Sequence, residues 1–352
     1  MEHGAMNTCP SPNSSATPSQ LRVAVVQMSC QLGDRPANLA RAEGMLEEAG
    51  GQGAQLVLLP ELAPGGYTLT EALWDTAEPF DGPTTQWLRK TCSRLQMYVG
   101  TTFLEADGED FYNCFVLMGP DGKVVGRVRK NPPASFEAWY FRAGSDPHWF
   151  DTPLGRIGVG ICFENALYER YLELHAADID LLLRPFSGAS FEARWPIRQR
   201  DVEIVDAALR DGTEESARAW GIPVLMANKV GRLVTTLPMG FPKQNVEFPG
   251  FSAVADGNGK VLGQLRSGTE GVIVGNVTLN SASKRRELRP NDWGRWTTPM
   301  PWWAGIWVMT QKLGERAYAR SEKRRARARA VSNGSLALAT SASTNRHLHP
   351  AP

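Results

Sequence analysis

The sequence predicts an α/β fold with a mixed β-sheet. From residue 21 onward, short apolar segments typical of buried strands alternate with segments of helical periodicity. Some successive strands are separated only by a tight turn, which favours antiparallel pairing, whereas others are separated by a helix, which favours parallel pairing. The chain has 352 residues, 42% hydrophobic and 21% charged, enough for one large α/β domain or two ordinary ones.

The first elements predict a β-α-β unit. Leu21–Gln27 (LRVAVVQ) and Gln55–Leu59 have strand patterns, and the helix-like segment Ala37–Ala49 lies between them. A second helix is expected at Thr84–Leu95. It precedes a part of the chain in which strands follow one another directly.

That part begins with three predicted strands, at Tyr98–Leu104, Asn113–Met118 and Val124–Arg129. The last two are joined by Gly119-Pro120-Asp121-Gly122, a turn sequence that is a strong hairpin signal. We therefore expect an antiparallel pair here.

The next part returns to alternating elements. Arg156–Cys162 (RIGVGIC) is a predicted strand, and helices are predicted at Leu167–Ala177 and, as one long stretch, at Val202–Trp220. Further strands are expected at Asp180–Leu183, Pro223–Ala227, Phe251–Val254, Val261–Leu265 and Val272–Val277. The segments 185–196 and 233–248 carry no such pattern and are interpreted as loops.

The two ends of the chain differ from this domain. Residues 1–20 are polar and rich in Ser and Pro without the apolar run of a secretory signal, so we expect a disordered leader, and residues 331–352 are expected to be a disordered tail. Residues 21–280 carry 24 Lys and Arg against 32 Asp and Glu, a net charge of −8, whereas residues 281–352 carry 14 against 4, a net charge of +10. We therefore predict a domain at 21–280 and a separate basic extension at 281–330.

The cysteine pattern argues against disulfides and a zinc site. The five cysteines are odd in number, widely spaced and without a CxxC pair. No run of about 20 apolar residues exists. We therefore expect a cytoplasmic protein that needs neither a metal nor a cofactor.

Cys162 is the candidate nucleophile. It ends a strand in which Gly158 and Gly160 allow close packing, and it lies just before a predicted helix start. The N–H groups and partial charge of a helix N-terminus would lower the thiol pKa and stabilise an oxyanion. A buried structural cysteine is the alternative.

A carboxylate is the expected base for this cysteine. His148 and His175 are the only histidines outside the terminal segments, and neither lies in a recognisable catalytic motif. Glu61 follows the strand in LVLLPEL, where a carboxylate would lie at the C-terminal edge of a sheet, the usual ligand position in α/β proteins. Lys130 ends another strand.

In type and order, these residues resemble the Glu–Lys–Cys set of the nitrilase superfamily of carbon–nitrogen hydrolases. The resemblance covers about residues 21–278. Its pieces are AVVQ (24–27), LPEL (59–62), PGGY ending at 67, YN (112–113), GPDGKVVGRVRK (119–130), FEAWYFRAGSD (136–146), DTPLGRIGVGICFEN (151–165), PVLMANKVG (223–231) and FPGFSAVADGNGKVL (248–262). The segment NPPAS after the lysine departs from the family's usual aliphatic-rich turn.

The resemblance implies a nitrilase-like α-β-β-α sandwich with mixed sheets. It implies that Glu61 is the general base, Lys130 the oxyanion-stabilising cation and Cys162 the nucleophile. Glu137 matches the second glutamate, which positions the lysine and the substrate. We further expect Tyr67, Phe163 and Phe186 to line the substrate pocket, and the N–H of Phe163 to assist Lys130.

The substrate class remains open at this point. Glu164-Asn165 after the nucleophile leans toward true nitrilases, whereas FEAWYFRAGSD and GRIGVGIC are amidase-like. We favour hydrolysis of an amide or carbamoyl group through a cysteine thioester, with nitrile hydrolysis as the alternative. An acyltransferase with a soluble acceptor, or a non-catalytic interaction protein, is a further alternative.

The extension is predicted to act apart from catalysis. It contains five tryptophans between Trp293 and Trp307, and then a basic cluster at 323–329. We favour an arm that docks on a neighbouring subunit of a homo-oligomer, a dimer or larger, over peripheral contact with an anionic membrane; nucleic acid is the least favoured partner. Removing residues 281–352 should then change assembly or attachment more than chemistry.

Overall fold

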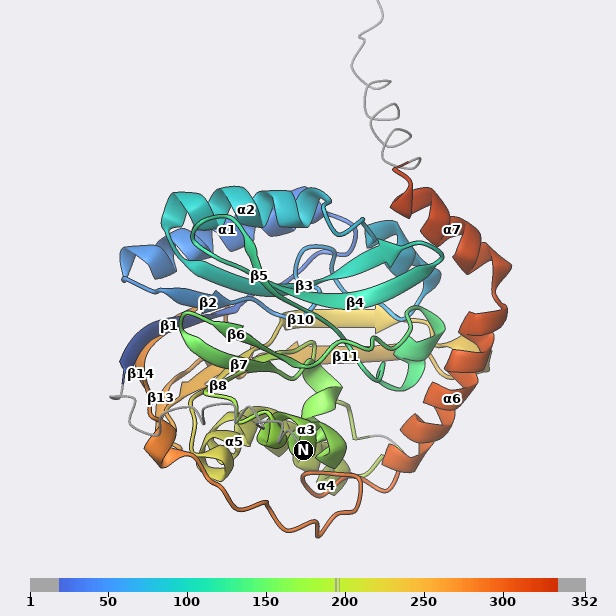
Figure 1. Ribbon diagram of the computed structural model, residues 1–352. Helices are drawn as coiled ribbons and strands as arrows, with labels where there is room; N and C mark the ends of the chain where they lie inside the picture. The colour runs from blue at the N-terminus through green and yellow to red at the C-terminus, as the bar shows by residue number, and fades with distance from the viewer. Residues whose placement is uncertain (1–18, 194, 196, 335–352) are drawn as a thin grey trace, which may run out of the picture.

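The computed structural model describes residues 19–334 except 194 and 196. Most of the expected leader and tail lies outside the described residues. Ser19 and Gln20 belong to the first strand, however, and the last helix continues to Ser332. Two six-stranded sheets stack face to face, and helices cover their outer faces (Figure 1).

The first sheet has the order β14-β1-β2-β3-β4-β5. Its strands are β1 (Ser19–Gln27), β2 (Leu56–Leu58), β3 (Tyr98–Asp107), β4 (Asp110–Met118), β5 (Val124–Arg129) and β14 (Gly271–Leu279). The pairs β1–β2 and β2–β3 are parallel, and the others are antiparallel. The predicted β-α-β opening and the hairpin at residues 119–122 are both present.

The second sheet has the order β13-β12-β9-β8-β7-β6. Its strands are β6 (Trp149–Thr152), β7 (Gly155–Val159), β8 (Leu181–Pro185), β9 (Val224–Ala227), β12 (Ala253–Ala255) and β13 (Val261–Gln264). The central strands β7, β8 and β9 run parallel, and the edges are antiparallel. Both sheets are therefore mixed, as predicted.

Helices α1 (Arg35–Gly51) and α2 (Pro83–Leu95) cover the first sheet, and α3 (Tyr168–Ala176), α4 (Gln199–Arg210) and α5 (Gly212–Trp220) cover the second (Figure 1). The 3-10 turns are η1 (Glu71–Thr76), η2 (Ser135–Trp139), η3 (Cys162–Ala166), η4 (Pro238–Gly240) and η5 (Ser281–Ser283).

The prediction of one helix at 202–220 is wrong, because the chain turns at Asp211, where α4 ends and α5 begins.

Three strands were not predicted: β6, and two that overlap the segment 233–248 interpreted as a loop. β10 (Val230–Thr235) and β11 (Gln244–Pro249) pair as an antiparallel hairpin outside the two large sheets. Leu233, Val246 and Phe248 form a small apolar cluster on it. The alternation of buried and exposed side chains along β10 is broken at Gly231 and Arg232, which are both exposed, so the local strand signal is weak.

The core forms because side chains alternate along each strand. On β1, Val23 and Val25 face the second sheet and pack with residues such as Val159, whereas Ala24 and Val26 face α1 and α2. Nearly all of these side chains are fully buried. The α-β-β-α layering follows from strands that are apolar on both faces.

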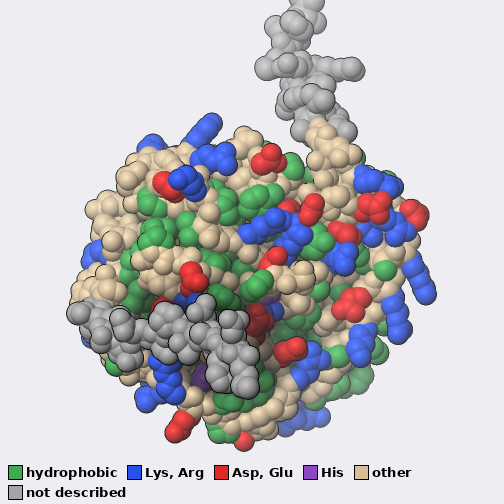
Figure 2. Space-filling view, in the orientation of Figure 1, with side chains coloured by type: hydrophobic (Ala, Val, Ile, Leu, Met, Phe, Trp, Pro, Cys, Tyr) green, Lys and Arg blue, Asp and Glu red, His purple; other side chains and the backbone are tan. Residues whose placement is uncertain are grey.

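The basic extension forms two helices, α6 (Ala304–Arg320) and α7 (Glu322–Ser332), that run along one side of the sandwich (Figure 1). Lys and Arg side chains along this side are mixed with Asp and Glu (Figure 2). Arg324 pairs with Asp110 on β4 of the same chain. Over the described residues, no helix has both the length and the apolarity that a membrane crossing requires.

Candidate active site

Cys162 lies where strand β7 gives way to the turn η3. Its backbone has a φ of 51°, a left-handed conformation that is uncommon for a residue other than glycine. Such a sharp turn exposes the side chain beyond the strand end, and strained backbone of this kind is concentrated at functional sites. Cys162 contributes to the wall of a cavity of about 270 Å³, together with Tyr67, Glu137 and Phe186.

Glu61 comes from the opposite sheet, in the segment that follows β2, and is fully buried. Its backbone N–H donates to the carbonyl of Phe186, which ties the two strand ends together. Carboxylate Oε1 accepts from Lys130 Nζ at 2.8 Å and from Asn113 Nδ2 at 2.7 Å. Within the described part of the chain, Oε2 has no hydrogen-bond partner. One carboxylate oxygen is therefore held in place and the other is available to take a proton.

Lys130 follows β5 and lies between two carboxylates. Its Nζ is 2.8 Å from Glu61 Oε1 and 2.8 Å from Glu137 Oε2. Burial lowers the pKa of Lys130, but the two carboxylates outweigh burial and raise this pKa above its usual value. The ammonium group therefore stays charged at neutral pH.

Glu137 lies on the turn η2 and receives three further contacts. Tyr67 Oη donates to its Oε1 at 2.9 Å, Lys130 Nζ lies 3.1 Å from Oε1, and the backbone N–H of Ala134 donates to Oε2 at 2.6 Å. Burial raises the pKa of Glu137, Lys130 opposes this, and Glu61 adds to it. Tyr67 thus lines the cavity, as predicted, and also holds Glu137.

The expected low pKa of the Cys162 thiol is wrong. Burial raises this pKa above its usual value, and Glu61 raises it further, while Lys130 opposes them. The physical reason is that Cys162 is enclosed beside a carboxylate, and the helix that follows, α3, begins only at Tyr168. A thiol in this state needs a base to remove its proton.

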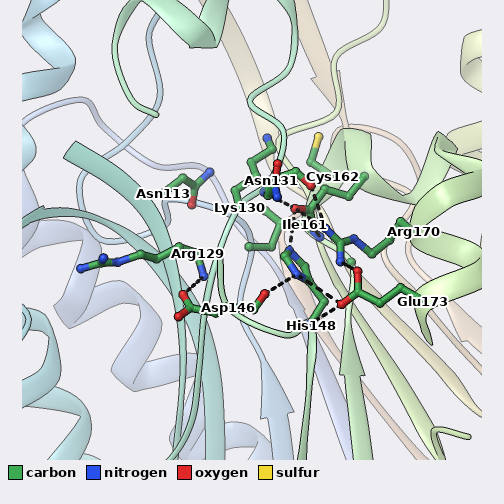
Figure 3. A network of polar contacts seen from close by, with 12 residues as sticks. Asn113, Arg129, Lys130, Asn131, Asp146, His148, Ile161, Cys162, Arg170 and Glu173 are labelled. Carbon is green, nitrogen blue, oxygen red and sulfur yellow. Dashed lines mark hydrogen bonds and ion pairs between the residues drawn. The ribbon is translucent and has the colours of Figure 1, made fainter. Parts of the chain in front are cut away.

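Neither histidine occupies the position of that base. His148 Nε2 lies 2.8 Å from Glu164 Oε1, and its Nδ1 lies 3.1 Å from the carbonyl of Asp146. In Figure 3 the sulfur of Cys162 points away from His148. His175 Nε2 lies 3.1 Å from the carbonyl of Arg285. Both histidines serve local structure.

Glu164 and Asn165 support the turn that carries Cys162. Glu164 accepts from the N–H of Ile161 at 2.6 Å and from the N–H of Asn131 at 2.5 Å. Asn165 Nδ2 donates to the carbonyl of Cys162 at 2.9 Å. These polar groups are engaged by backbone and by His148, and both residues also border the cavity.

Two site residues were not predicted from the sequence. Asn113 orients Glu61, and it belongs to the motif YN at 112–113, which could have indicated it as a site residue. Lys229 is buried, donates to the carbonyl of Leu62 at 3.3 Å and lies 5.6 Å from the centre of the Tyr67 ring. The motif PVLMANKVG contains this lysine, but the motif alone did not predict that Lys229 lies at the site. Burial lowers the pKa of Lys229.

The predicted lining residues Phe163 and Phe186 both border the cavity. The extension borders it too, with Met300, Pro301 and Trp307. The prediction that the extension acts apart from catalysis stays a prediction, which removal of residues 281–352 tests. Its contact with the cavity is not evident from the sequence, because residues far apart in the chain meet there.

A metal site is not evident in the described ranges, 19–193, 195 and 197–334. No group of three or more His, Cys, Asp or Glu side chains is arranged there to hold an ion.

The sequence pattern of the carbon–nitrogen hydrolase family matches residues 22–287, most of the chain. The chain belongs to this family. Among the curated relatives, the omega-amidase of Danio rerio is 32% identical over 221 residues, 58% of this chain and 79% of the relative. Nitrilase 3 of Arabidopsis thaliana is 31% identical over 194 residues, 49% of this chain and 56% of the relative. The match with this nitrilase thus spans about half of the plant protein.

Solved structures of carbon–nitrogen hydrolases share the fold. A variant of the amidase from Nesterenkonia, described as carrying acrylamide added at its active-site cysteine, superimposes with a TM-score of 0.59 and 20% identity. The superposition covers 72% of this chain and 92% of the amidase. At this level of identity the likeness establishes the α-β-β-α fold of the nitrilase superfamily.

Proposed function

We propose that this carbon–nitrogen hydrolase cleaves a non-peptide amide or carbamoyl bond through a thioester on Cys162. The main support for this proposal is the arrangement of Glu61. One of its carboxylate oxygens accepts hydrogen bonds from Lys130 and Asn113, and the other has no partner among the described residues. A partly buried thiol with a raised pKa borders the same cavity as the second glutamate. The set supplies a base, a cation and a nucleophile.

The reaction follows from these groups. Glu61 accepts the thiol proton as the sulfur of Cys162 attacks the carbonyl carbon, and Lys130 with the N–H of Phe163 stabilises the oxyanion. The carbon–nitrogen bond then breaks, and protonated Glu61 gives its proton to the leaving amine. Water, deprotonated by Glu61, attacks the thioester, and the proton returns to sulfur as the carboxylic acid leaves. Glu137 positions Lys130.

Nitrile hydrolysis is the second candidate, because curated relatives include both an omega-amidase and a nitrilase. The same thiol would add to the nitrile carbon and reach the same thioester after water enters and ammonia leaves. An acyltransferase would differ only in the group that attacks the thioester.

A screen for ammonia release tests the proposal, with amides, N-carbamoyl compounds and nitriles as substrates. Cys162→Ala should abolish hydrolysis, whereas Cys30→Ala, the matched cysteine control outside the site, should retain it. Glu61→Gln should lower the chemical step by about 10²-fold or more, the scale of a positioned base. Hydrolysis by the Cys162→Ala variant, or a larger loss in His148→Ala than in Glu61→Gln at equal folded fraction, would contradict this mechanism.

We also propose that the protein assembles as a homo-oligomer, a dimer or larger. Trp293 and Trp302 of the extension are exposed on the single chain and offer apolar contact area. Peripheral contact with an anionic membrane is the alternative use of the same surface.

A further inference from the structure

Arg184 is a buried cation that forms no ion pair with a carboxylate of the described residues. It lies on β8 with only 5% of its surface exposed. Its hydrogen bonds come from Nη1, which donates to the carbonyl of Gly212 at 2.5 Å and to Ser216 Oγ at 3.1 Å. Nε has no partner, and no ion pair involves Arg184 in the part of the chain that the structure describes. A buried charge left in this state is costly unless a ligand supplies the opposite charge.

The guanidinium group borders the cavity that contains the nucleophile. Arg184 and Cys162 are both part of the cavity wall. Phe186 directly follows β8, and the guanidinium carbon of Arg184 is 5.1 Å from the centre of its ring. Cys162 packs against the apolar cluster that contains Phe186. The thiol and the cation therefore both lie near the residues around Phe186 at the cavity wall.

Other charged groups of the cavity form no ion pair with Arg184 among the described residues. Arg170, also in the wall, is paired with Glu173. Burial lowers the pKa of Arg184 to about 10, while Cys162 and, to a smaller extent, Glu215 at the cavity wall raise it. Arg184 therefore remains protonated at neutral pH.

We propose that Arg184 binds a carboxylate at the far end of the acyl group of the substrate. The substrates would then be amides, N-carbamoyl compounds or nitriles whose acyl chain carries a carboxylate several atoms from the bond that is cleaved. The planar guanidinium can hold a carboxylate with two parallel hydrogen bonds. Val205, Leu209 and Phe186 supply apolar walls for the carbon chain between the two groups. This inference rests on the proposed function, because it assigns the acyl group of that reaction.

Direct binding of short linear dicarboxylates tests the subsite without turnover. The intact protein should bind them more tightly than monocarboxylates of equal length, as measured by calorimetry. Arg184→Met should reduce the affinity for dicarboxylates relative to monocarboxylates by about 10²-fold, the size of effect expected when one partner of a buried charge pair is removed. Arg184→Lys should retain part of it. Glu215→Gln removes a negative charge near the subsite and should therefore strengthen dicarboxylate binding. It is a control whose effect on affinity is opposite to that of Arg184→Met.

Kinetics separate binding from a structural role. For the monoamide of a dicarboxylic acid, Arg184→Met should raise KM by about 10²-fold. For a neutral amide of equal length, both kcat and KM should stay close to those of the intact protein. Equal losses of activity on both amides would show that Arg184 only connects β8 to α5, and would overturn the subsite.

The outcomes also separate this inference from the proposed function. If the intact protein bound dicarboxylates no better than monocarboxylates, the subsite would be refuted whether or not amides are cleaved. If the preference were present and sensitive to Arg184→Met, but no carbon–nitrogen bond were cleaved, the subsite would stand and the proposed function would fail.

Discussion

At Cys162, burial first and then the neighbouring charges determine the pKa of the thiol. Burial and Glu61 disfavour the thiolate, whereas Lys130 favours it. Glu61 and Glu137 together carry one more negative charge than Lys130, so the buried set is not neutral when all three are ionised. This arrangement keeps the thiol protonated at rest and places the acceptor of its proton in the same site.

Opposite shifts of the thiol pKa are therefore expected in two variants. Glu61→Gln removes the anion that raises the pKa of Cys162, so this pKa should fall. Lys130→Met removes the cation that lowers it, so this pKa should rise. Ultraviolet absorbance of the thiolate across a pH titration measures both, with Cys162→Ala as the blank for the other cysteines. An unchanged thiol pKa in both variants would show that burial alone controls this thiol.

At the scale of elements, the extension supports the two turns that carry the site. Phe163 on η3 lies edge-on to Trp296 and Trp307, with ring centres 5.9 and 5.6 Å apart. Ser135 on η2 hydrogen-bonds to Thr310 on α6 at 2.8 Å. At Gly314 an added Cβ would lie 2.4 Å from the Trp139 ring, so α6 approaches η2 closely enough to require glycine. The extension thus contacts the elements that hold Cys162 and Glu137.

Truncating Trp307 should impair the chemistry. Trp307→Ala removes the ring that packs against Phe163, whose N–H is the proposed oxyanion donor, and kcat should fall by about tenfold because small misplacements of catalytic groups are costly. Trp302→Ala is the matched control, since Trp302 is 56% exposed and its loss should leave kcat unchanged. Steady-state kinetics at equal folded fraction give the comparison. Equal kcat in both variants would refute a supporting role for this ring.

The attachment of α7 should depend mainly on one buried ion pair. Arg324 lies 2.6 Å from Asp110 and is nearly fully buried, so Arg324→Ala should cost about 3 kcal/mol of unfolding free energy. Arg327 pairs with Asp75 at a more exposed position, and Arg327→Ala should cost less than about 1 kcal/mol. Denaturant unfolding measures both. A larger loss from Arg327→Ala would show that burial is not what decides the strength of these pairs.

At the scale of the whole molecule, charges of the extension meet charges of the domain within one chain. Lys323 pairs with Glu71 and Arg329 with Glu109, in addition to the pairs of Arg324 and Arg327. The asymmetry of −8 and +10 seen in the sequence therefore has an intramolecular explanation. The apolar surface of the extension remains available for a second copy.

Particle size should accordingly be insensitive to salt. If copies associate through apolar contact, raising the ionic strength to about 1 M, where the Debye length is about 3 Å, should leave the particle intact. Light scattering at low and high salt measures this, and a chain truncated after residue 280 shows whether the extension is needed for association. Dissociation to single chains at high salt would instead assign the basic residues to the contact between copies.

Most elements of the fold could be predicted because their signals are local. Alternation along β1, the turn at residues 119–122 and the helical periodicity of α2 depend on neighbouring residues only. The β10–β11 hairpin was missed because its local strand pattern is weak. The break at Asp211 was missed because the helical pattern of the sequence continues through it. The candidate catalytic residues were found because each lies at a strand end within a recognisable motif.

The sequence by itself determined the succession of strands and helices, the strand-end positions of Glu61, Lys130 and Cys162, and the charge of the extension. Only the tertiary structure decided the pKa of the thiol, the partners of His148 and Glu164, the cavity around Arg184, and the second oxygen of Glu61, which has no partner among the described residues. The physical reason is that a side chain's charge state and partners depend on burial and on groups brought together from distant parts of the chain. Nothing in LLLRPF distinguishes Arg184 from other arginines. It becomes a buried cation, without an ion pair in the described residues, only when α5 packs on β8.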